Sequence, residues 1–145
     1  MNRSITECYS AALPADRQGE VFHRYILGVY DLYERLTSQF PEILFESCAS
    51  GGARFDPGML YYAPQAWTSD DTDAVERLKI QYGSSYCYPL SSMGSHVSVC
   101  PNHQLNRTTP LYTRPTWHTW NLGYELDLNK LTEEEQEEVK EQIKF

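Results

Sequence analysis

The sequence has 145 residues, of which 41% are hydrophobic, and it carries a formal net charge of −8 at pH 7. This length corresponds to about one domain, and the acidic balance argues against nucleic acid as a partner, because a phosphate backbone attracts basic surfaces. No apolar run reaches the ~18 residues of a membrane-spanning helix and no signal-sequence pattern opens the chain, so we expect a cytoplasmic protein without a membrane partner. The cysteines are too scattered for a disulfide scaffold, and we expect reduced thiols at Cys8, Cys48, Cys87 and Cys100.

The first third of the sequence contains the clearest helix signal. Residues 1–18 are polar and turn-rich, and Pro14 and Asp16 are typical of a helix start. Between residues 20 and 40, apolar side chains recur every three or four positions, which predicts a helix with one apolar stripe that stops at Pro41. The stripe is formed by Val21, Phe22, Tyr25, Ile26, Val29, Leu32, Tyr33 and Leu36.

Two short apolar runs in the middle of the sequence predict buried parallel strands, one at residues 43–47 and one at residues 65–68. A further apolar piece lies at residues 59–62. A helix is predicted at residues 73–82, with Gly83 as its C-terminal cap. The predicted buried face of this helix consists of Ala74, Val75, Leu78 and Tyr82.

The last third of the sequence predicts more strands and a final helix. The strand candidates are residues 86–89, 94–99 and 123–128, and residues 101–104 are interpreted as a loop. Thr132 and Glu135 form a capping box for a helix with the acidic run 133–138 on its solvated face. Helices thus alternate with parallel-type strands, which predicts an α/β fold. Because no G-x-G-x-x-G loop is present, half of a (β/α)8 barrel fits this pattern better than a complete doubly wound sheet.

Three aspartates, Asp70, Asp71 and Asp73, follow a predicted strand end beside Trp67. On a barrel, catalytic groups lie at that end of the strands. Neighbouring carboxylates repel one another, so at least one is expected to have a raised pKa unless a cation or a helix N-terminus intervenes. A carboxylic acid with a raised pKa is what a glycosidase needs as its general acid. Helix capping is the competing interpretation, and both can hold because a cap uses only one or two of the three.

A thiol and two glycines follow the predicted strand at residues 43–47. Cys48 is a candidate nucleophile by its position, but the sequence shows no Cys-His-Asn arrangement. Gly51 and Gly52 indicate either a close approach of the backbone or a positive φ angle. A small polar ligand packed against the loop explains them, and so does a tight turn.

Three potential metal ligands, His96, Cys100 and His103, lie close together in the sequence. Structural zinc sites use four ligands at recurrent spacing, and the sequence has no C-x-x-C pair. Hydrogen-bonding roles in a loop are the favoured interpretation, and we expect neither a metal nor a cofactor.

Two long motifs resemble the α-galactosidases of glycoside hydrolase family 36, the melibiases. They are ESCASGGARFDPGMLYY, from Glu46 to Tyr62, and WTSDDTDA, from Trp67 to Ala74. The stretches RLKIQYG, SSMG, HVS and PNHQ, followed by the tail at residues 123–135, extend the similarity over nearly the whole sequence. The resemblance implies that residues 1–145 are part of a catalytic domain, namely the C-terminal half of its (β/α)8 barrel.

The resemblance also implies a retaining two-carboxylate mechanism that removes terminal α-galactosyl residues from melibiose- and raffinose-type oligosaccharides. It assigns the acid/base role to Asp70. It places Cys48, Ser50, Gly51 and Trp67 in the galactose-binding site, where the glycine permits a close approach of the backbone to sugar hydroxyls. Full-length relatives are expected to be homo-oligomers.

Two stretches depart from the family pattern. The family's nucleophile lies in a Lys-Trp-Asp motif directly followed by Met-Asn-Arg, and this sequence opens with Met1-Asn2-Arg3. The resemblance therefore implies a fragment that starts just after the nucleophile, with Asn2 at the edge of the sugar site, and we expect the isolated chain to be inactive. Residues 112–120 replace a small and apolar run with a proline and two tryptophans, which divergence or a local sequence error would each produce.

Two alternatives remain beside hydrolysis. A galactosyl-transferring relative, similar to raffinose synthase, shares the motifs and differs in using a sugar hydroxyl as the acceptor. The other alternative is an inactive sugar-binding or structural fragment. Half a barrel exposes two sheet edges and an uncovered core, so such a fragment is expected to aggregate or pair.

Overall fold

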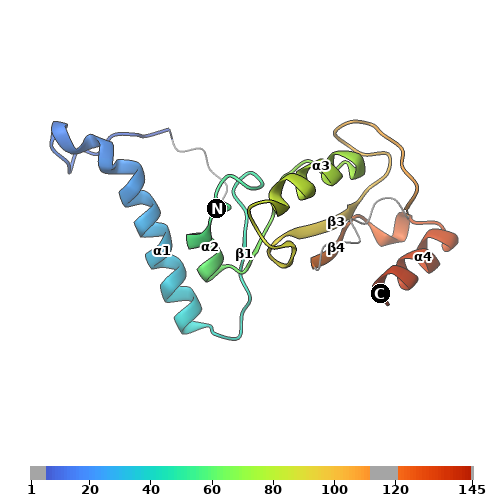
Figure 1. Ribbon diagram of the computed structural model, residues 1–145. Coiled ribbons are helices and arrows are strands. Elements are labelled where there is room, and N and C mark those ends of the chain that lie inside the picture. The colour runs from blue at the N-terminus through green and yellow to red at the C-terminus, as the bar shows by residue number, and fades with distance from the viewer. Residues whose placement is uncertain (1–5, 112–120, 145) are drawn as a thin grey trace.

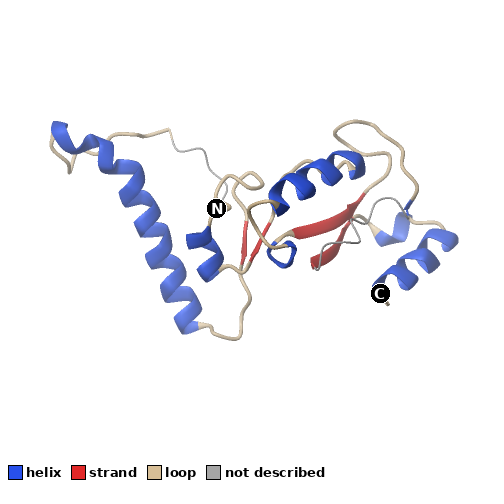
Figure 2. Ribbon diagram, in the orientation of Figure 1, coloured by secondary structure: helices blue, strands red, loops and turns tan. Residues whose placement is uncertain are grey.

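The structure is a computed structural model that describes residues 6–111 and 121–144 (Figure 1). Helices separate the first three strands of the described residues, and a helix follows the fourth (Figure 2), which establishes the predicted α/β class. The elements are η1 (Ala15–Glu20), α1 (Val21–Gln39), β1 (Glu46–Ser47), α2 (Pro57–Tyr62), β2 (Gln65–Ala66), α3 (Ala74–Ser85), η2 (Leu90–Ser92), β3 (Gly94–Ser98), β4 (Asn121–Glu125), η4 (Leu128–Lys130) and α4 (Glu133–Ile143).

The four strands of the described residues are parallel and follow one another in sequence order. β1 pairs with β2, and β3 pairs with β4 over five residue pairs, from Gly94 opposite Asn121 to Ser98 opposite Glu125. A single parallel bridge between Ala66 and Met93 connects the two pairs. Pairing in sequence order without a reversal differs from a doubly wound sheet, in which the strand order reverses at a switch point.

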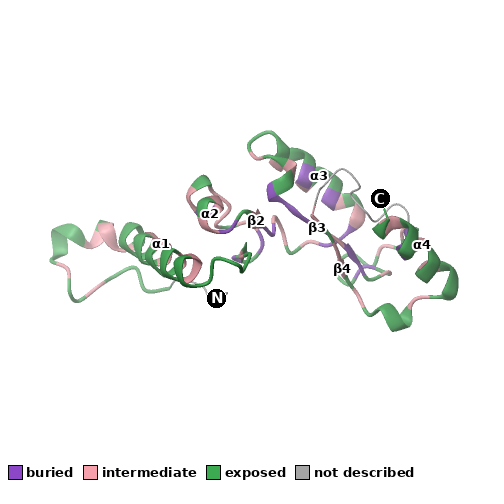
Figure 3. Ribbon diagram, turned by 90° about the horizontal axis from the view of Figure 1, so that it is seen from below, coloured by how far each residue is buried: buried purple, intermediate pink, exposed green. Residues whose placement is uncertain are grey.

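The predicted N-terminal helix is confirmed as α1, within one residue at each end, and η1 precedes it. The predicted apolar stripe is packed in one part and exposed in another. Tyr33 of the stripe packs on Tyr62 of α2 with ring centroids 6.2 Å apart, and so does Tyr30, which lies outside the stripe, at 5.8 Å. By contrast, Phe22 and Leu32 are exposed, and no residue of α1 is buried. α1 therefore stands to one side of the strands, next to α2 (Figures 1 and 3).

The first predicted strand is shorter than expected. Only Glu46 and Ser47 of residues 43–47 are in a strand, and Ile43 and Leu44 are exposed. The Ile43 N–H donates to the Phe40 carbonyl at 3.1 Å, so the start of this apolar run belongs to the turn that follows α1. Pairing begins only at Glu46, which lies opposite Gln65.

The apolar piece at residues 59–62 is the end of a short helix, α2, rather than extended backbone. Asp56 caps this helix by accepting a hydrogen bond from the Met59 N–H at 2.9 Å, and Pro57 occupies its first turn. An aspartate followed by proline is a helix-start signal. The Asp56-Pro57 pair is therefore the local feature of the sequence that explains α2.

The predicted helix is confirmed as α3, but its predicted C-terminal cap and its predicted buried face are wrong. Gly83 lies inside the helix, which continues to Ser85. Leu78 is 56% exposed and Tyr82 is also exposed, whereas Arg77, only 2% exposed, faces the strands. A cation can be buried here because main-chain carbonyls accept its hydrogen bonds, as described below.

The segment that follows α3 agrees with prediction in part. Residues 86–89 form turns instead of a strand, because the N–H groups of Cys87 and Tyr88 both donate to the Ser84 carbonyl. The strands predicted at residues 94–99 and 123–128 are confirmed as β3 and β4, within a few residues.

The final helix is α4, and its capping box is present. The Thr132 hydroxyl accepts from the Glu135 N–H at 3.2 Å, and the Glu135 carboxylate accepts from the Thr132 N–H at 3.1 Å. The acidic run is largely exposed, as predicted, while Val139 of α4 is buried against Val97 of β3 and Leu111 (Figure 3). None of the helices in the described ranges has the length and apolarity needed to cross a membrane.

Candidate active site

Two loops meet at the carboxyl ends of β1 and β2. We call residues 48–52 the glycine loop and residues 67–73 the aspartate loop. Ser50 and Gly51 have φ angles of +51° and +72°, and the Ala49 N–H donates to the Gly51 carbonyl at 2.9 Å. The glycine loop is therefore a tight turn, and its left-handed backbone favours glycine at position 51.

The glycines also allow the two loops to touch. A Cβ atom on Gly51 would lie 2.7 Å from the Ser69 Cα and 2.8 Å from the Asp70 nitrogen. A Cβ atom on Gly52 would lie 2.5 Å from the Thr68 carbonyl oxygen. These distances are too short for any side chain, so the glycine loop requires glycine because the aspartate loop packs directly against it.

The three aspartates have different surroundings. Asp73 is 1% exposed and caps α3, accepting from the N–H groups of Val75 and Glu76, each at 3.0 Å. Arg107 donates to the same Asp73 oxygen at 2.8 Å. The helix N-terminus and this cation together stabilise the buried carboxylate. The capping interpretation is thus confirmed for Asp73.

Asp71 and Asp70 are placed differently from Asp73. Asp71 accepts a hydrogen bond from the Asp73 N–H at 3.0 Å, and this contact fixes the turn of backbone that leads into α3. Asp70 is exposed, and within the described residues its carboxylate makes neither a hydrogen bond nor an ion pair. Of the three, Asp70 is the carboxylate available to a ligand.

Trp67 begins the aspartate loop and is 8% exposed. Its ring stacks on His96 of β3, with centroids 4.5 Å apart, and the Arg77 guanidinium lies 4.3 Å from the centroid of the Trp67 ring. Arg77 donates to the carbonyls of Ser69 and Gly94, each at 2.9 Å. This arginine therefore connects α3 to the aspartate loop and to the start of β3.

Burial lowers the pKa of Arg77 to about 10, and the negative charges of Asp71 and Glu125 oppose this shift. The guanidinium stays charged at neutral pH. Its two carbonyl acceptors and the Trp67 ring supply the contacts that replace water around a buried cation.

Arg77→Lys is expected to lower the free energy of unfolding by about 2 to 4 kcal/mol, because an ammonium group cannot reach both carbonyls and stack on the Trp67 ring. Urea unfolding followed by tryptophan fluorescence measures this. The reverse exchange on the same helix, Lys79→Arg, is the control, since Lys79 is exposed and pairs only with Glu76 at the surface of the described part. Its expected effect is within about 0.5 kcal/mol. Equal effects of the two exchanges would contradict the role given to Arg77.

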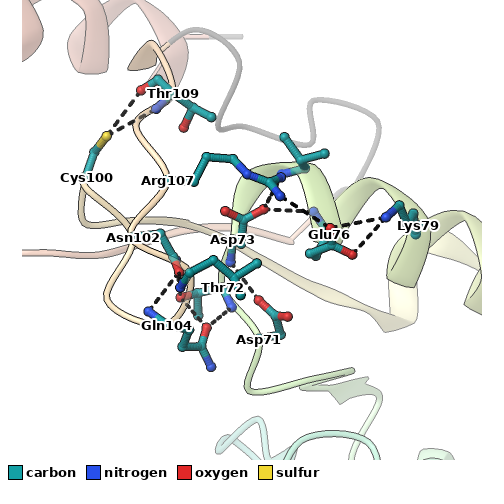
Figure 4. Close-up of polar contacts among 12 residues, drawn as sticks. Asp71, Thr72, Asp73, Glu76, Lys79, Cys100, Asn102, Gln104, Arg107 and Thr109 are labelled. Carbon is teal, nitrogen blue, oxygen red and sulfur yellow. Dashed lines mark hydrogen bonds and ion pairs between the residues drawn. The ribbon is translucent and has the colours of Figure 1, made fainter.

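A third loop, residues 99–109, follows β3 and packs on the aspartate loop (Figure 4). The Gln104 side chain accepts from the Thr72 N–H and donates to the Asp70 carbonyl, both at 2.8 Å. The Thr72 hydroxyl accepts from Ser98 at 3.1 Å and from Asn102 at 3.2 Å. The sequence predicted only a loop at residues 101–104. The one local feature that could have indicated these contacts is the polar Asn-His-Gln stretch in that loop.

Five of the six residues predicted for the site lie in the two touching loops: Cys48, Ser50, Gly51, Trp67 and Asp70. Asn2 lies outside the described residues, as does the divergent stretch 112–120. The Cys48 thiol is exposed and has no hydrogen-bonded histidine in residues 6–111 and 121–144. The described part of the structure therefore gives Cys48 no partner base.

The three potential metal ligands are in different surroundings. His96 stacks on Trp67, with its Nδ1 4.0 Å from Glu125, while Cys100 accepts from the Thr109 N–H at 3.3 Å. His103 is exposed. Across residues 6–111 and 121–144, no group of three or more His, Cys, Asp or Glu side chains is arranged to hold a metal ion.

Parallel strands in sequence order, with the loops at the carboxyl ends of β1 and β2 in contact, define a segment of an α/β protein. The sequence profile of the Melibiase family matches residues 1–145. The chain belongs to this family.

Known relatives align along the whole sequence. α-Galactosidase AgaA from Geobacillus stearothermophilus is 60% identical over 146 residues, covering 100% of this protein and 20% of AgaA. α-Galactosidase Mel36A from Lactobacillus acidophilus is 57% identical over 144 residues, covering 99% of this protein and 20% of Mel36A. The sequence thus spans about a fifth of the length of these curated relatives.

Solved structures show the same architecture. An α-galactosidase from Lactobacillus brevis superposes with a TM-score of 0.94 at 59% identity, over 100% of this protein and 20% of the L. brevis protein. AgaA superposes with a TM-score of 0.91 at 59% identity, with the same coverage. Variants of AgaA have also been solved in complex with raffinose and with stachyose.

Proposed function

We propose that this protein supplies part of the active site of a retaining α-galactosidase that removes terminal α-galactosyl residues from raffinose- and melibiose-type oligosaccharides. The proposal depends above all on 60% identity to AgaA along the entire sequence. Asp70 is the proposed acid/base: it protonates the leaving oxygen and then activates water. Its carboxylate is exposed on the loop that follows β2 and is not bound by any described residue, which supports a role in contacting substrate.

The four strands are proposed to be consecutive strands of a (β/α)8 barrel, in its C-terminal half. Their parallel pairing in sequence order supports this, as do the helices that follow β1, β2 and β4. In such a barrel the loops after the strands form the active site. The exposed apolar side chains of α1, such as Phe22 and Leu32, are then surfaces that further parts of the fold would cover.

The galactose subsite is proposed to have two walls. Cys48, Ser50 and Gly51 form one wall, with backbone close to the sugar hydroxyls, and Asp70 with Trp67 forms the other. Because Trp67 is largely covered by neighbouring side chains, it would contact the sugar through the part of its ring that stays exposed. Asn2 is proposed for the edge of the same subsite.

The cellular setting is also a proposal. Four free thiols favour a reducing compartment, so we place the protein in the cytoplasm. The full-length protein is proposed to be a homo-oligomer.

A chimaera tests the function. Residues 1–145 would replace the matching segment of AgaA, and the product would be assayed for galactose release from raffinose; we call it the AgaA chimaera. Activity within about tenfold of AgaA is expected, because the exchanged segment is 60% identical. A chimaera that unfolds at the temperature of AgaA but releases no galactose would contradict the proposal.

Product analysis of the same assay separates hydrolysis from transfer. With water as the acceptor, free galactose accumulates at any sucrose concentration. A transferring enzyme would instead return galactose to sucrose, and the yield of free galactose would fall as sucrose increases.

A further inference from the structure

We propose that Gln104 is a positioning residue for the acid/base carboxylate of Asp70, acting through the backbone of the aspartate loop. The inference rests on the proposed function and adds a residue from the third loop to it. The Gln104 amide accepts from the Thr72 N–H at 2.8 Å (Figure 4). It also donates to the Asp70 carbonyl at 2.8 Å. One side chain thus holds the peptide groups on both sides of residue 71.

Backbone restraint matters here because no described residue restrains the Asp70 side chain. Within the described residues its carboxylate makes no hydrogen bond or ion pair, so its place follows from the backbone that carries it. Gly51 packs against this backbone at the Asp70 nitrogen, and Gln104 holds it at the Asp70 carbonyl. The residue that bears the acid is thereby held at both ends.

Gln104 is itself held by the loop around it. The Asn102 carboxamide oxygen accepts from the N–H groups of Gln104 and Leu105 at 2.9 and 3.0 Å. The Asn102 N–H donates to the Arg107 carbonyl at 2.9 Å, which closes the loop. A glutamine anchored in this way can restrain a second loop, because its own conformational freedom is already reduced.

The expected consequence concerns proton transfer more than substrate binding. A general acid accelerates departure of a sugar leaving group, which is a poor one, and contributes little when the leaving group is an activated phenol. A displaced Asp70 should therefore lower kcat/KM for raffinose much more than kcat/KM for an activated aryl α-galactoside. A residue needed only for folding would lower both to the same extent.

The test uses Gln104→Met in the AgaA chimaera, because methionine keeps the side-chain length and loses the hydrogen bonds to the Asp70 carbonyl and to the N–H and hydroxyl groups of Thr72. We expect kcat/KM for raffinose to fall by about 10- to 100-fold and that for the aryl galactoside by less than about 3-fold. Gln104→Glu is the second variant. It retains an acceptor for the Thr72 N–H but places a carboxylate oxygen next to the Asp70 carbonyl oxygen. Its kcat/KM for raffinose should fall at least as far as that of Gln104→Met. Gln104 is exposed, so neither variant opens a cavity.

His103→Ala is the matched control, since His103 is the exposed neighbour on the same loop and its side chain makes no hydrogen bond within the described residues. Its kcat/KM should be unchanged for both substrates. Equal losses on the two substrates in Gln104→Met, or no loss on either, would overturn the inference. Asp70→Asn in the same chimaera separates failure of this inference from failure of the proposed function. If Asp70→Asn loses kcat/KM equally on raffinose and on the aryl galactoside, the acid/base role proposed for Asp70 is wrong.

Discussion

In the AgaA chimaera, Asp70→Asn is expected to lower kcat/KM for raffinose by about 10²- to 10⁴-fold, the range contributed by a general acid. The asparagine amide is isosteric with the carboxyl group, but its N–H protons are not acidic enough to be transferred to the departing sugar oxygen. An activated aryl α-galactoside needs little protonation, so its kcat/KM should change far less. This parameter covers only the steps up to cleavage, whereas kcat also includes the later hydrolysis, in which Asp70 acts as base.

The matched control is Asp71→Asn, the same change one residue further along the sequence. Asp71 accepts a hydrogen bond from the Asp73 N–H, and the asparagine carbonyl oxygen retains that acceptor. The control should therefore keep kcat/KM within about threefold on both substrates. If the two variants lose raffinose activity equally, or if Asp70→Asn loses as much on the aryl substrate, Asp70 is not the acid.

Gly51→Ala is expected to damage both stability and activity. The added Cβ would stand 2.7 Å from the Ser69 Cα and 2.8 Å from the Asp70 nitrogen, and main-chain atoms cannot rotate aside as those of a flexible side chain do. The φ of +72° adds about 1 kcal/mol of strain for an L-residue, and overpacking adds about 1 to 3 kcal/mol. We expect the free energy of unfolding to fall by about 2 to 4 kcal/mol in urea titrations.

The same substitution should move the aspartate loop. A displacement of the Asp70 backbone by about 1 Å can cost about 10²-fold in rate. The AgaA chimaera with Gly51→Ala should therefore lose raffinose activity even below its unfolding temperature.

Gly28→Ala is the control for this effect, because Gly28 lies inside α1 and an added Cβ meets nothing within 4 Å. Alanine is the better helix former, so this control should gain up to about 1 kcal/mol. A Gly51→Ala protein with unchanged stability and activity would mean that the two loops do not touch in solution.

Local interactions account for the elements that the sequence predicted well. The apolar period located α1, and the pair Thr132 and Glu135 located the start of α4, because both signals act within a few residues along the sequence. The prediction of the buried face of α3 failed because distant partners decide it. Arg77 looks like a surface residue until its acceptors are known, and these lie 8 and 17 residues away, at Ser69 and Gly94.

For the site, the sequence by itself determined the family and the two stretches that we propose carry its chemistry, the glycine loop and the aspartate loop. Only the tertiary structure decided how they are used: Asp73 caps α3, Asp70 keeps a free carboxylate within the described residues, and Gly51 makes room for the aspartate loop. It also brought Gln104 to Asp70 across 34 residues of sequence. The physical reason is that these roles are set by contacts between loops far apart in the sequence, which composition and spacing do not encode.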